Sequence, residues 1–348
     1  MTRKSDLAVA VLAALGAVVF LVWLWMTDSR SRHPLERLGR AVAWQSTCPF
    51  PQDSQARVVA TGLGEVRGLA CNGQGGVFLA DSKGHVMLWS ANGLLEPSYA
   101  SAEPDSTDLR GLAMADGALL LAEHGRGSLL RWDGQSMSAL SFGIGPYSGP
   151  AGIARAGDTL FLTDDRPWPG APEEQAYDSA DYGRWLEKGT PRLFGAVYAC
   201  TPQDHRCERV GTRLRHPSGI AAMSATGPVF VAEADSTEVR WAILKKDESG
   251  SWKQSGALGS AATGGKPMPP FLGVALDPAN GYVFAAGPLG IYVFSTEGSI
   301  LGRVDFDDPV SGLSCQPGAV FAVVGHRLCR IGYAPREAGS QPAVKAGK

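Results

Sequence analysis

Apolar and polar residues alternate in short runs over most of the chain between residues 57 and 333, and polar turns rich in Gly and Pro separate the runs. Such alternation is typical of half-buried β-strands. Within it, a Gly followed by Leu, Ile or Val and then by Ala or Ser recurs six times, each time before a further apolar run. The six copies are Arg67-Gly68-Leu69-Ala70, Arg110-Gly111-Leu112-Ala113, Ala151-Gly152-Ile153-Ala154, Ser218-Gly219-Ile220-Ala221, Leu272-Gly273-Val274-Ala275 and Ser311-Gly312-Leu313-Ser314.

The compact copies are roughly 40 residues apart, the length that one four-stranded sheet requires. The pattern therefore predicts an all-β fold, a six-bladed β-propeller over residues 57–333. In the first blade we expect strands at 68–71, 77–80, 86–89 and 97–100. The sixth repeat carries only three strands, whereas the alternating segment 57–61 belongs to no repeat. Pairing these two ends of the chain would close the ring and remove an exposed strand edge.

The first residues have a different character. Residues 7–26 carry no charge and are long enough for a helix to cross a membrane, with Trp23 and Trp25 where an aromatic belt lies. No small-residue cleavage site follows, which favours an uncleaved transmembrane anchor. We therefore expect a short tail at 1–6, the anchor at 7–26, a linker at 27–56 and a disordered tail at 334–348.

The six cysteines all lie outside the predicted anchor. Cys200 and Cys207 flank a tight turn between two facing strands, where a disulfide is easily formed. Cys48 and Cys329 lie near the two ends of the propeller, so a bond between them would tie the ends together. Cys71 and Cys315 occupy equivalent places in the first and last repeats, either as a bridge or as two free thiols.

Location and partners follow from the cysteines and the charge. Basic residues flank the predicted anchor on both sides, and their count alone would place the propeller in the cytoplasm. The expected disulfides favour the periplasmic, lumenal or extracellular side of a single-pass membrane protein. The net charge of −2 gives no reason to expect a nucleic-acid partner.

The start of each inner strand and the end of the second strand share one rim of the propeller. The residues before the repeated Gly put Arg67, Arg110 and Ser218 there. Second strands end on the same rim with Asp81, Glu123, His124, Asp164, Asp165, Glu233 and Asp235. In the third blade the next connection expands to residues 166–192, with a short helix expected at 172–188. It is either a lid over the channel or a surface decoration.

Several segments resemble the gluconolactonases of the regucalcin type. They are Glu123-His124-Gly125-Arg126, Phe161-Leu162-Thr163-Asp164, Gly195-Ala196-Val197-Tyr198, His216-Pro217-Ser218-Gly219-Ile220-Ala221 with the following Val229-Phe230-Val231-Ala232-Glu233, and the run 273–303. The N-terminal anchor, the terminal cysteines and the aromatic insert are similar to the related paraoxonases. This resemblance implies a six-bladed propeller that holds calcium or another divalent ion in its channel and hydrolyses lactones or esters.

The same resemblance shows a departure from the family. Its metal ligands come largely from pre-Gly positions, where this chain has Arg67, Ala151, Ser218 and Leu272. A hard cation needs several oxygen ligands, so no metal is expected at these positions. Glu65, two residues from the lost ligand, and Asp164, at a paraoxonase-like position, are the candidate replacements.

The arginines suggest another function. Arg67 and Arg110, with Ser218, Asp81 and Asp165 nearby, can hold a small anionic ligand through a carboxylate or phosphate. Alternatively, Asp81, Glu123 or Asp165 neutralises them as a structural ion-pair cluster. His124 beside Glu123 is the candidate general base, or part of the scaffold. The sequence thus predicts an anion-binding propeller. The alternatives are a lactone or ester hydrolase with a rearranged divalent-metal site, such as calcium, and a structural ectodomain scaffold.

Overall fold

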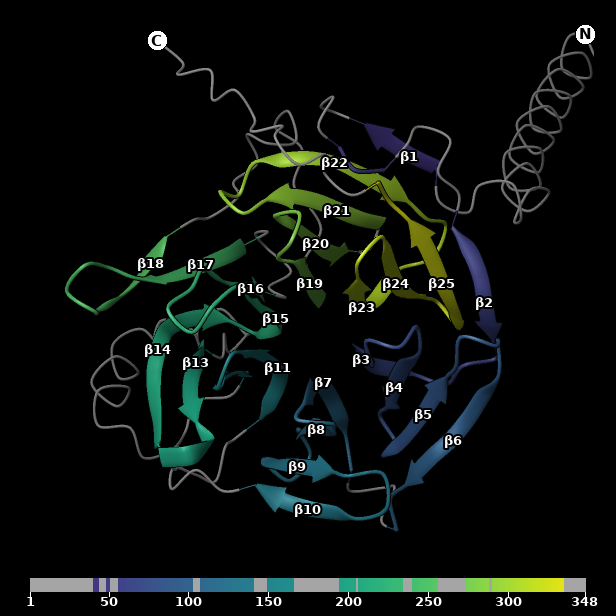
Figure 1. Ribbon diagram of the computed structural model, residues 1–348, viewed down its shortest axis with the longest axis horizontal. Coiled ribbons are helices and arrows are strands. Elements are labelled where there is room, and N and C mark those ends of the chain that lie inside the picture. Colours follow the sequence, from purple (N-terminus) through teal and green to yellow (C-terminus); the bar gives the residue numbers. More distant parts are fainter. Residues whose placement is uncertain are drawn as a thin grey trace, which may run out of the picture. The chain divides into compact units, whose positions relative to one another are not determined.

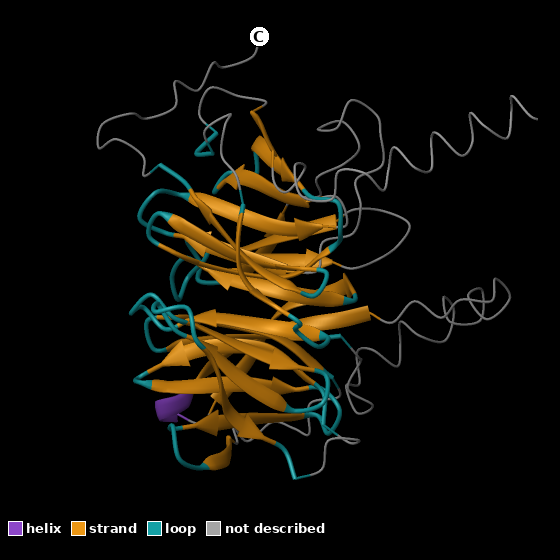
Figure 2. Ribbon diagram, turned by 90° about the vertical axis from the view of Figure 1, so that its right-hand side faces the viewer, coloured by secondary structure: helices purple, strands orange, loops and turns teal. Residues whose placement is uncertain are grey.

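The computed structural model describes residues 40–43, 48–50, 56–102, 107–140, 149–165, 194–204, 206–233, 240–255, 273–287 and 290–334. The chain divides into two units, residues 1–38 and 39–348, and every described residue lies in the second. This unit contains six antiparallel sheets arranged as a ring around a central axis (Figure 1). Seen from the side, the strands of successive blades lie in stacked layers (Figure 2). The predicted six-bladed propeller is confirmed.

The first three blades each contain four strands in chain order. Blade one contains β3 (Val66–Cys71), β4 (Val77–Asp81), β5 (His85–Trp89) and β6 (Leu95–Ala100). Blade two contains β7 (Leu109–Ala115), β8 (Ala118–Glu123), β9 (Ser128–Trp132) and β10 (Met137–Leu140). Blade three contains β11 (Pro150–Ala156), β12 (Thr159–Asp164), β13 (Phe194–Thr201) and β14 (Arg206–Arg215), with a 3-10 turn (Pro202–Asp204) between the last two.

The other three blades include two strands from the beginning of the chain. Blade four contains β15 (Pro217–Ala222), β16 (Val229–Glu233), β17 (Arg240–Lys246) and β18 (Trp252–Ser255). Blade five contains β19 (Gly273–Asp277), β20 (Tyr282–Gly287), β21 (Gly290–Ser295) and β22 (Ile300–Asp305), with β1 (Arg40–Ala43) at its outer edge. Blade six contains β23 (Val310–Gln316), β24 (Ala319–Val324) and β25 (Arg327–Gly332), completed by β2 (Arg57–Thr61).

The ring closes as the sequence predicts. β2 pairs antiparallel with β25, so that Val58 lies opposite Cys329 and Ala60 opposite Leu328. The two ends of the propeller therefore form one sheet, which removes the unpaired edge that the last repeat would otherwise expose. The fifth strand of blade five was not foreseen. β1 lies within the predicted linker and pairs antiparallel with β22, from Arg40 opposite Asp305 to Ala43 opposite Gly302.

The repeated Gly is explained by the packing of the inner strands around the channel. A Cβ added to Gly111 would lie 2.9 Å from both the carbonyl oxygen of Ala151 and Cα of Gly152 in the next blade. A Cβ on Gly219 would lie 2.6 Å from Cα of Gly273, and one on Gly273 would lie 3.2 Å from the backbone nitrogen of Leu313. In blades one to four the inner strand thus approaches the next one too closely for a side chain at this position, whereas a Cβ on Gly312 of blade six would first meet the side chain of Leu69.

Apolar side chains from neighbouring blades pack between the sheets. Leu79 of blade one and Phe321 of blade six belong to the same buried cluster, and the rings of Trp89 and Phe321 lie 5.5 Å apart. A separate cluster joins blades four and five, with Phe230 and Phe294 both fully buried. The core therefore lies in the wedges between blades, which leaves the channel itself to side chains at the starts of the inner strands.

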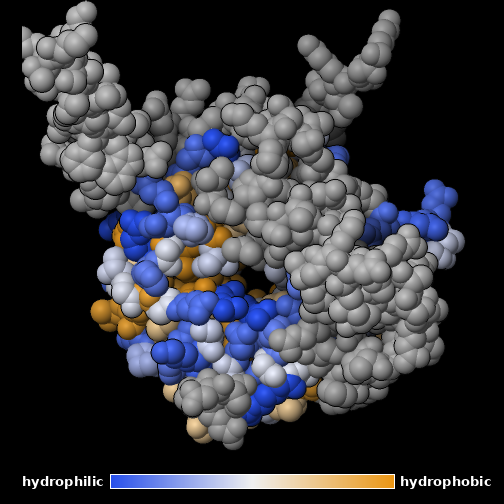
Figure 3. Space-filling model, turned by 180° about the vertical axis from the view of Figure 1, so that it is seen from behind, coloured by the Kyte–Doolittle hydropathy of each residue, from blue (hydrophilic) through white to orange (hydrophobic). Residues whose placement is uncertain are grey.

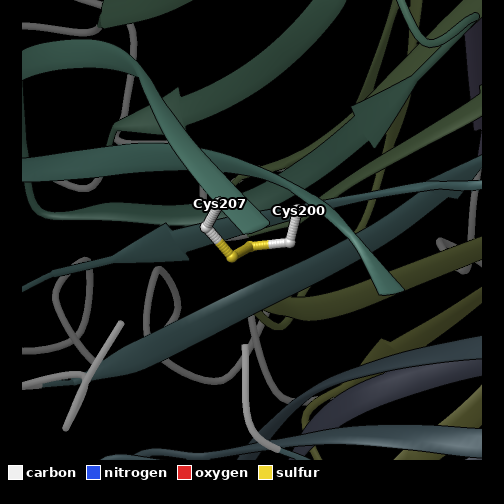
Figure 4. Close-up of a disulfide and its surroundings, with 2 residues drawn as sticks. All are labelled: Cys200 and Cys207. Carbon is white, nitrogen blue, oxygen red and sulfur yellow. A yellow bond between two sulfur atoms is a disulfide. The ribbon is translucent and has the colours of Figure 1, made fainter. Parts of the chain in front are cut away.

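The predicted hairpin disulfide is confirmed. Cys200 and Cys207 lie opposite each other on β13 and β14 and are bonded to each other (Figure 4). Cys71 and Cys315, for which the sequence left two possibilities, are both free thiols.

The predicted bond between Cys48 and Cys329 is wrong, because both are free cysteines. The segment before the propeller lies against the end of blade six, where the backbone nitrogen of Ala334 donates to the carbonyl oxygen of Pro49. The ring of Phe50 packs 5.8 Å from that of Phe284 in blade five. Cys329 lies five residues before Ala334, in the extended β25, a separation of about 16 Å along a strand. A disulfide needs Cα atoms within about 7 Å of each other.

Three other predictions fall outside the described residues: the anchor at 7–26, the insert at 166–192 and the tail beyond 334. Within the described part of the chain, no helix is both long and apolar enough to cross a membrane. The anchor thus remains an expectation from the sequence.

Candidate functional site

A cavity of about 670 Å³ lies at the start of the inner strands. Its wall is formed by the repeated glycine of each of the six blades and by residues next to these glycines, together with turns on the same rim. The space is within the range of pockets that hold small organic ligands. On the face shown in Figure 3, hydrophilic surface borders a hollow near the middle of the ring. The rim predicted from the topology is therefore the wall of a cavity.

Charged side chains alternate in sign from blade one to blade three along this wall. Nη2 of Arg67 donates to Oε1 of Glu65 at 2.6 Å. Nε of Arg110 donates to Oδ2 of Asp108, and its Nη1 donates to Oδ2 of Asp165, both at 2.9 Å. The carboxylate of Asp108 also lies 4.0 Å from Nε of Arg67, which joins the two arginines into one cluster.

Asp108 joins this charged cluster, although the sequence patterns did not single it out. It lies two residues before Arg110 and carries an oxygen bonded to that arginine. Glu65 stands in the same relation to Arg67, two residues earlier in the chain and bonded to it. The signal was present in the sequence, since an acid, one apolar residue, an Arg and a Gly occur in that order in both blades one and two.

His124 lies behind the cavity wall. Its side chain is 3% exposed, and its Nε2 lies 2.9 Å from Oδ1 of Asp165 while its Nδ1 lies 3.5 Å from Oδ2 of Asp108. Burial alone would lower the pKa of His124, but the hydrogen bonds with Asp108 and Asp165 outweigh it and raise the pKa. Because the imidazole is buried and favours its protonated form, it does not fit the predicted role of general base.

The same cluster acts on Asp108. Burial alone would raise the pKa of its carboxyl group, but the hydrogen bond with His124 and the charge and hydrogen bond of Arg110 lower the pKa to about 2. Asp108 is therefore a carboxylate at any physiological pH. Its charge compensates the positive charge that Arg110 brings to the rim.

Three acidic residues expected at the site instead accept hydrogen bonds from the backbone of nearby turns. Asp81 accepts hydrogen bonds from the backbone nitrogens of Lys83 and His85 and contacts the imidazole of His85 at 2.7 Å. Glu123 accepts from the backbone nitrogen of Arg126 and from Ser128. Asp164 accepts from the backbone nitrogen of Gly149 at 2.8 Å. The predicted ligand-binding role of Asp81 and catalytic role of Glu123 are therefore corrected, because neither lines the cavity.

Neutral side chains from blades four and six line other parts of the cavity. Ser218 and Ser311 line the cavity as pre-Gly residues, and each hydroxyl donates to a backbone carbonyl, of Ala232 and Val66 respectively. His216 lines it with a backbone φ of +46°, a conformation uncommon outside glycine. His326, which the sequence analysis did not single out, lines it from the turn between β24 and β25.

The donor set does not fit the calcium ion that the family resemblance implies. A hard cation takes six to eight oxygen ligands. Here Arg67 and Arg110 bring positive charge, Ala151 brings no side-chain donor, and Leu272 lies outside the described residues. Of the two candidate replacement ligands, Glu65 is bonded to Arg67, whereas Asp164 is buried and accepts a hydrogen bond from the backbone of Gly149. The two carboxylates therefore do not converge on one metal position. Among the described residues, no group of three acidic, His or Cys side chains is placed to hold a metal.

Comparison with known proteins identifies the fold. No family model and no curated protein matches the chain in sequence. Among solved structures, a structural-genomics target assigned as a gluconolactonase has a TM-score of 0.64 at 20% identity, covering 86% of this chain and 98% of that one. A gluconolactonase from Xanthomonas campestris has a TM-score of 0.63 at 19% identity, covering 85% of this chain and 95% of that one.

The fold is that of the gluconolactonases. A calcium-binding protein, regucalcin, from Agrobacterium tumefaciens is similar as well, with a TM-score of 0.59 at 14% identity, covering 82% of this chain and 96% of that one. The resemblance noted in the sequence is thus confirmed at the level of architecture. At such identities a shared fold does not carry a shared activity. The site of this chain must be interpreted from its own residues.

Proposed function

We propose that the channel of this propeller binds a small hydroxylated carboxylate, of the sugar-acid or sugar-lactone class, without a metal ion. The observation that carries the proposal is the pair of guanidinium groups, Arg67 and Arg110, on one wall of a ligand-sized cavity. A guanidinium has five N–H donors and suits the two oxygens of a carboxylate. Nε and Nη1 of Arg110 donate to Asp108 and Asp165, respectively. Nη2 of Arg110 has no hydrogen bond within the described structure and can donate to a ligand.

The surrounding carboxylates favour a ligand that also carries hydroxyl groups. Glu65 and Asp165 line the cavity and can only accept hydrogen bonds when ionised. A purely anionic ligand would meet their negative charge, whereas a sugar acid offers hydroxyl donors beside its carboxylate. The three carboxylates Glu65, Asp108 and Asp165 and the two arginines sum to −1, which a protonated His124 brings to neutrality. The site would therefore select its ligand by where the individual charges lie and not by the net charge of the cavity.

The structural comparisons support the same class of ligand, because proteins of this fold include gluconolactonases. A hydrolase with a rearranged metal site is the second candidate, and it is disfavoured because the described residues around the cavity offer no convergent set of oxygen donors. A structural scaffold is the third. We further propose that the propeller is tethered to a membrane by residues 7–26, on the periplasmic, lumenal or extracellular side. The uncharged segment and the confirmed disulfide support this part of the proposal.

The test measures binding of sodium gluconate to the purified full chain by calorimetry and by thermal unfolding, with glucose as the neutral analogue. We expect gluconate to bind and to raise the melting temperature, and glucose to have a much smaller effect. Arg67→Ala removes one charge-assisted hydrogen bond, so the affinity should fall about 10-fold or more. Arg110→Lys keeps the charge but loses the two-pronged geometry, and should also weaken binding.

Arg155→Ala is the matched control. Arg155 is 26% exposed, close to the 25% of Arg110, but it pairs with Asp116 and does not line the cavity. Its removal should leave gluconate binding unchanged. If no member of a panel of sugar acids stabilises the chain, or if Arg155→Ala and Arg67→Ala behave alike, the channel is not an anion site. The metal-dependent hydrolase and the structural scaffold would then be the remaining candidates.

A further inference from the structure

The turn between β24 and β25 brings an imidazole, His326, to the same cavity that the first arginine of the charged cluster, Arg67, lines. His326 follows Gly325, whose φ of +56° allows a two-residue turn between Val324 and Arg327. On the other side of the ring closure, Leu63 directly precedes the Gly64 and Glu65 that line the same cavity. Blades six and one therefore meet where His326, Glu65 and Arg67 face one space.

His326 is held by two reciprocal hydrogen bonds. The backbone nitrogen of Leu63 donates to the carbonyl oxygen of His326, and Nδ1 of His326 lies 3.1 Å from the carbonyl oxygen of Leu63. A carbonyl oxygen can only accept, so Nδ1 must carry the proton. In the neutral ring the lone pair is then on Nε2, which has no hydrogen-bond partner among the described residues. Fixing one ring nitrogen on a backbone carbonyl is how proteins orient an imidazole that accepts protons at the other.

We propose that His326 is the proton acceptor of a metal-independent lactone and ester hydrolysis in the channel, with Arg67 as the cation beside the carbonyl oxygen. This inference rests on the proposed function, because the same cavity must admit the sugar lactone. His124, the candidate base from the sequence, is buried and lies between two carboxylates. His326 has the two properties that His124 lacks, a place on the cavity wall and an unoccupied acceptor nitrogen.

Water is the only co-reactant that the reaction requires. Nε2 of His326 takes a proton from a water molecule while the water oxygen forms a bond to the carbonyl carbon. The electron pair of the C=O double bond moves to oxygen, whose negative charge the Arg67 guanidinium stabilises. When the double bond re-forms, the ring C–O bond breaks and the leaving alkoxide takes the proton back from Nε2. The product is a hydroxy acid, and its carboxylate is the ligand that Arg67 and Arg110 are proposed to bind.

The experiment follows hydrolysis of a sugar γ-lactone and of p-nitrophenyl acetate by the full chain after treatment with EDTA. We expect turnover above the spontaneous rate, unchanged by EDTA, with gluconate as a competitive inhibitor. His326→Asn keeps an N–H that can donate to Leu63 but has no acceptor nitrogen of comparable basicity. It should lower kcat on the order of 100-fold to 10,000-fold, the range attributed to general acid–base catalysis. Gluconate affinity should change less than about 2-fold.

A second variant separates catalysis from folding. His326→Ala removes the side chain, and added imidazole should restore part of the activity of this variant but none to His326→Asn. His85→Asn is the matched control, because His85 is an imidazole bonded to Asp81 that does not line the cavity, and its turnover should equal that of the wild type.

Each contrary result has a distinct meaning. Turnover that EDTA abolishes and calcium restores would overturn the metal-independent chemistry. Loss of turnover in His216→Asn but not in His326→Asn would move the base to the other cavity imidazole and overturn the assignment. Gluconate binding without any turnover would leave the proposed function intact and refute this inference. Absence of both binding and turnover would refute the proposed function itself.

Discussion

Nε2 of His124 lies 2.9 Å from Oδ1 of Asp165, and the other ring nitrogen of His124 faces a second carboxylate, Asp108, at 3.5 Å. Only an imidazolium can donate from both ring nitrogens. The buried ring therefore binds a proton more tightly in the folded chain than in the unfolded one, and its pKa is raised. This proton neutralises part of the negative charge in the cluster around Arg110.

The first prediction concerns the stability of the fold as the pH rises. Because the folded-state pKa of His124 is above that of the unfolded chain, its contribution to stability is complete below the ordinary histidine pKa of about 6.5. It is lost as the pH rises through the folded-state pKa. Chemical denaturation between pH 5.5 and 9 should show the free energy of unfolding decreasing with pH. His124→Gln should flatten this dependence, whereas His85→Gln should keep it.

The second prediction concerns Asp108 and the acid side. Its pKa is lowered to about 2 in the folded chain, so its contribution is present above the unfolded value of 3.8 and is lost as the pH falls from about 4 to 2. The shift corresponds to about 2 kcal/mol. Asp108→Asn should lose this amount at pH 7 and show a shallower acid transition than the wild type. Asp116→Asn, an exposed acid outside the cavity, should unfold like the wild type.

Much of the fold could be predicted because the Gly repeat has a single physical origin. Neighbouring inner strands converge around the channel and leave little room for a side chain where they come closest. A Gly therefore recurs once per blade. The ring closure followed because the segment 57–61 alternated and belonged to no repeat. β1 was missed because four residues within a Pro- and Arg-containing stretch carry too short a pattern. Its pairing depends on the exposed edge of β22, which no local signal reveals.

The site was less predictable because burial and pairing are properties of the folded chain. Arg67, Arg110, Ser218 and Asp165 were placed correctly on the rim from topology alone. His124 follows the second strand of its blade at the expected rim, yet its ring turns behind the wall to meet Asp165. His326 was missed since its blade ends the second strand with Val324 rather than with an acid. The hydrogen bond that orients its ring is accepted by the carbonyl oxygen of Leu63, 263 residues away in sequence.

The third prediction tests the convergence of the inner strands. Gly111→Ala would place a Cβ 2.9 Å from three backbone atoms of the next blade, which cannot move without shifting the inner strand of blade three. We expect a loss of about 1–3 kcal/mol in the free energy of unfolding, as for other overpacked sites. Urea denaturation would measure it. Gly332→Ala is the control, since its Cβ would meet nothing closer than 4.0 Å, and an equal loss in both variants would contradict the explanation.

The fourth prediction concerns the hairpin disulfide. Cys200 and Cys207 close a short loop on β13 and β14, which restricts the unfolded chain. In the loop-entropy view such a loop contributes about 2 kcal/mol. The double variant Cys200→Ala and Cys207→Ala should unfold at a temperature several degrees lower than the wild type. Dithiothreitol should lower the wild-type melting temperature to that of the variant and leave the variant unchanged. A further decrease in the variant would point to another bond.

The fifth prediction concerns competition inside the cavity. The side chain of Glu65 is 67% exposed and bonds Arg67 at 2.6 Å, so under the proposed function it competes with the carboxylate of a ligand for this guanidinium. An exposed ion pair is weak, so an incoming anion displaces it at small cost. Glu65→Gln weakens this internal competitor and removes a repelling charge, and gluconate affinity should rise by up to about 5-fold.

Two controls make the fifth prediction specific. Glucose, which has no carboxylate, should bind Glu65→Gln no better than the wild type. Ser82→Ala removes only the hydroxyl that donates to Oε2 of Glu65 at 3.3 Å, and should change gluconate binding little. Calorimetry at two salt concentrations would show whether the gain is electrostatic, because the advantage of the variant should shrink as the salt screens the charges. A Glu65→Gln variant with weaker gluconate binding would mean that Glu65 orients Arg67 for the ligand instead of competing with it.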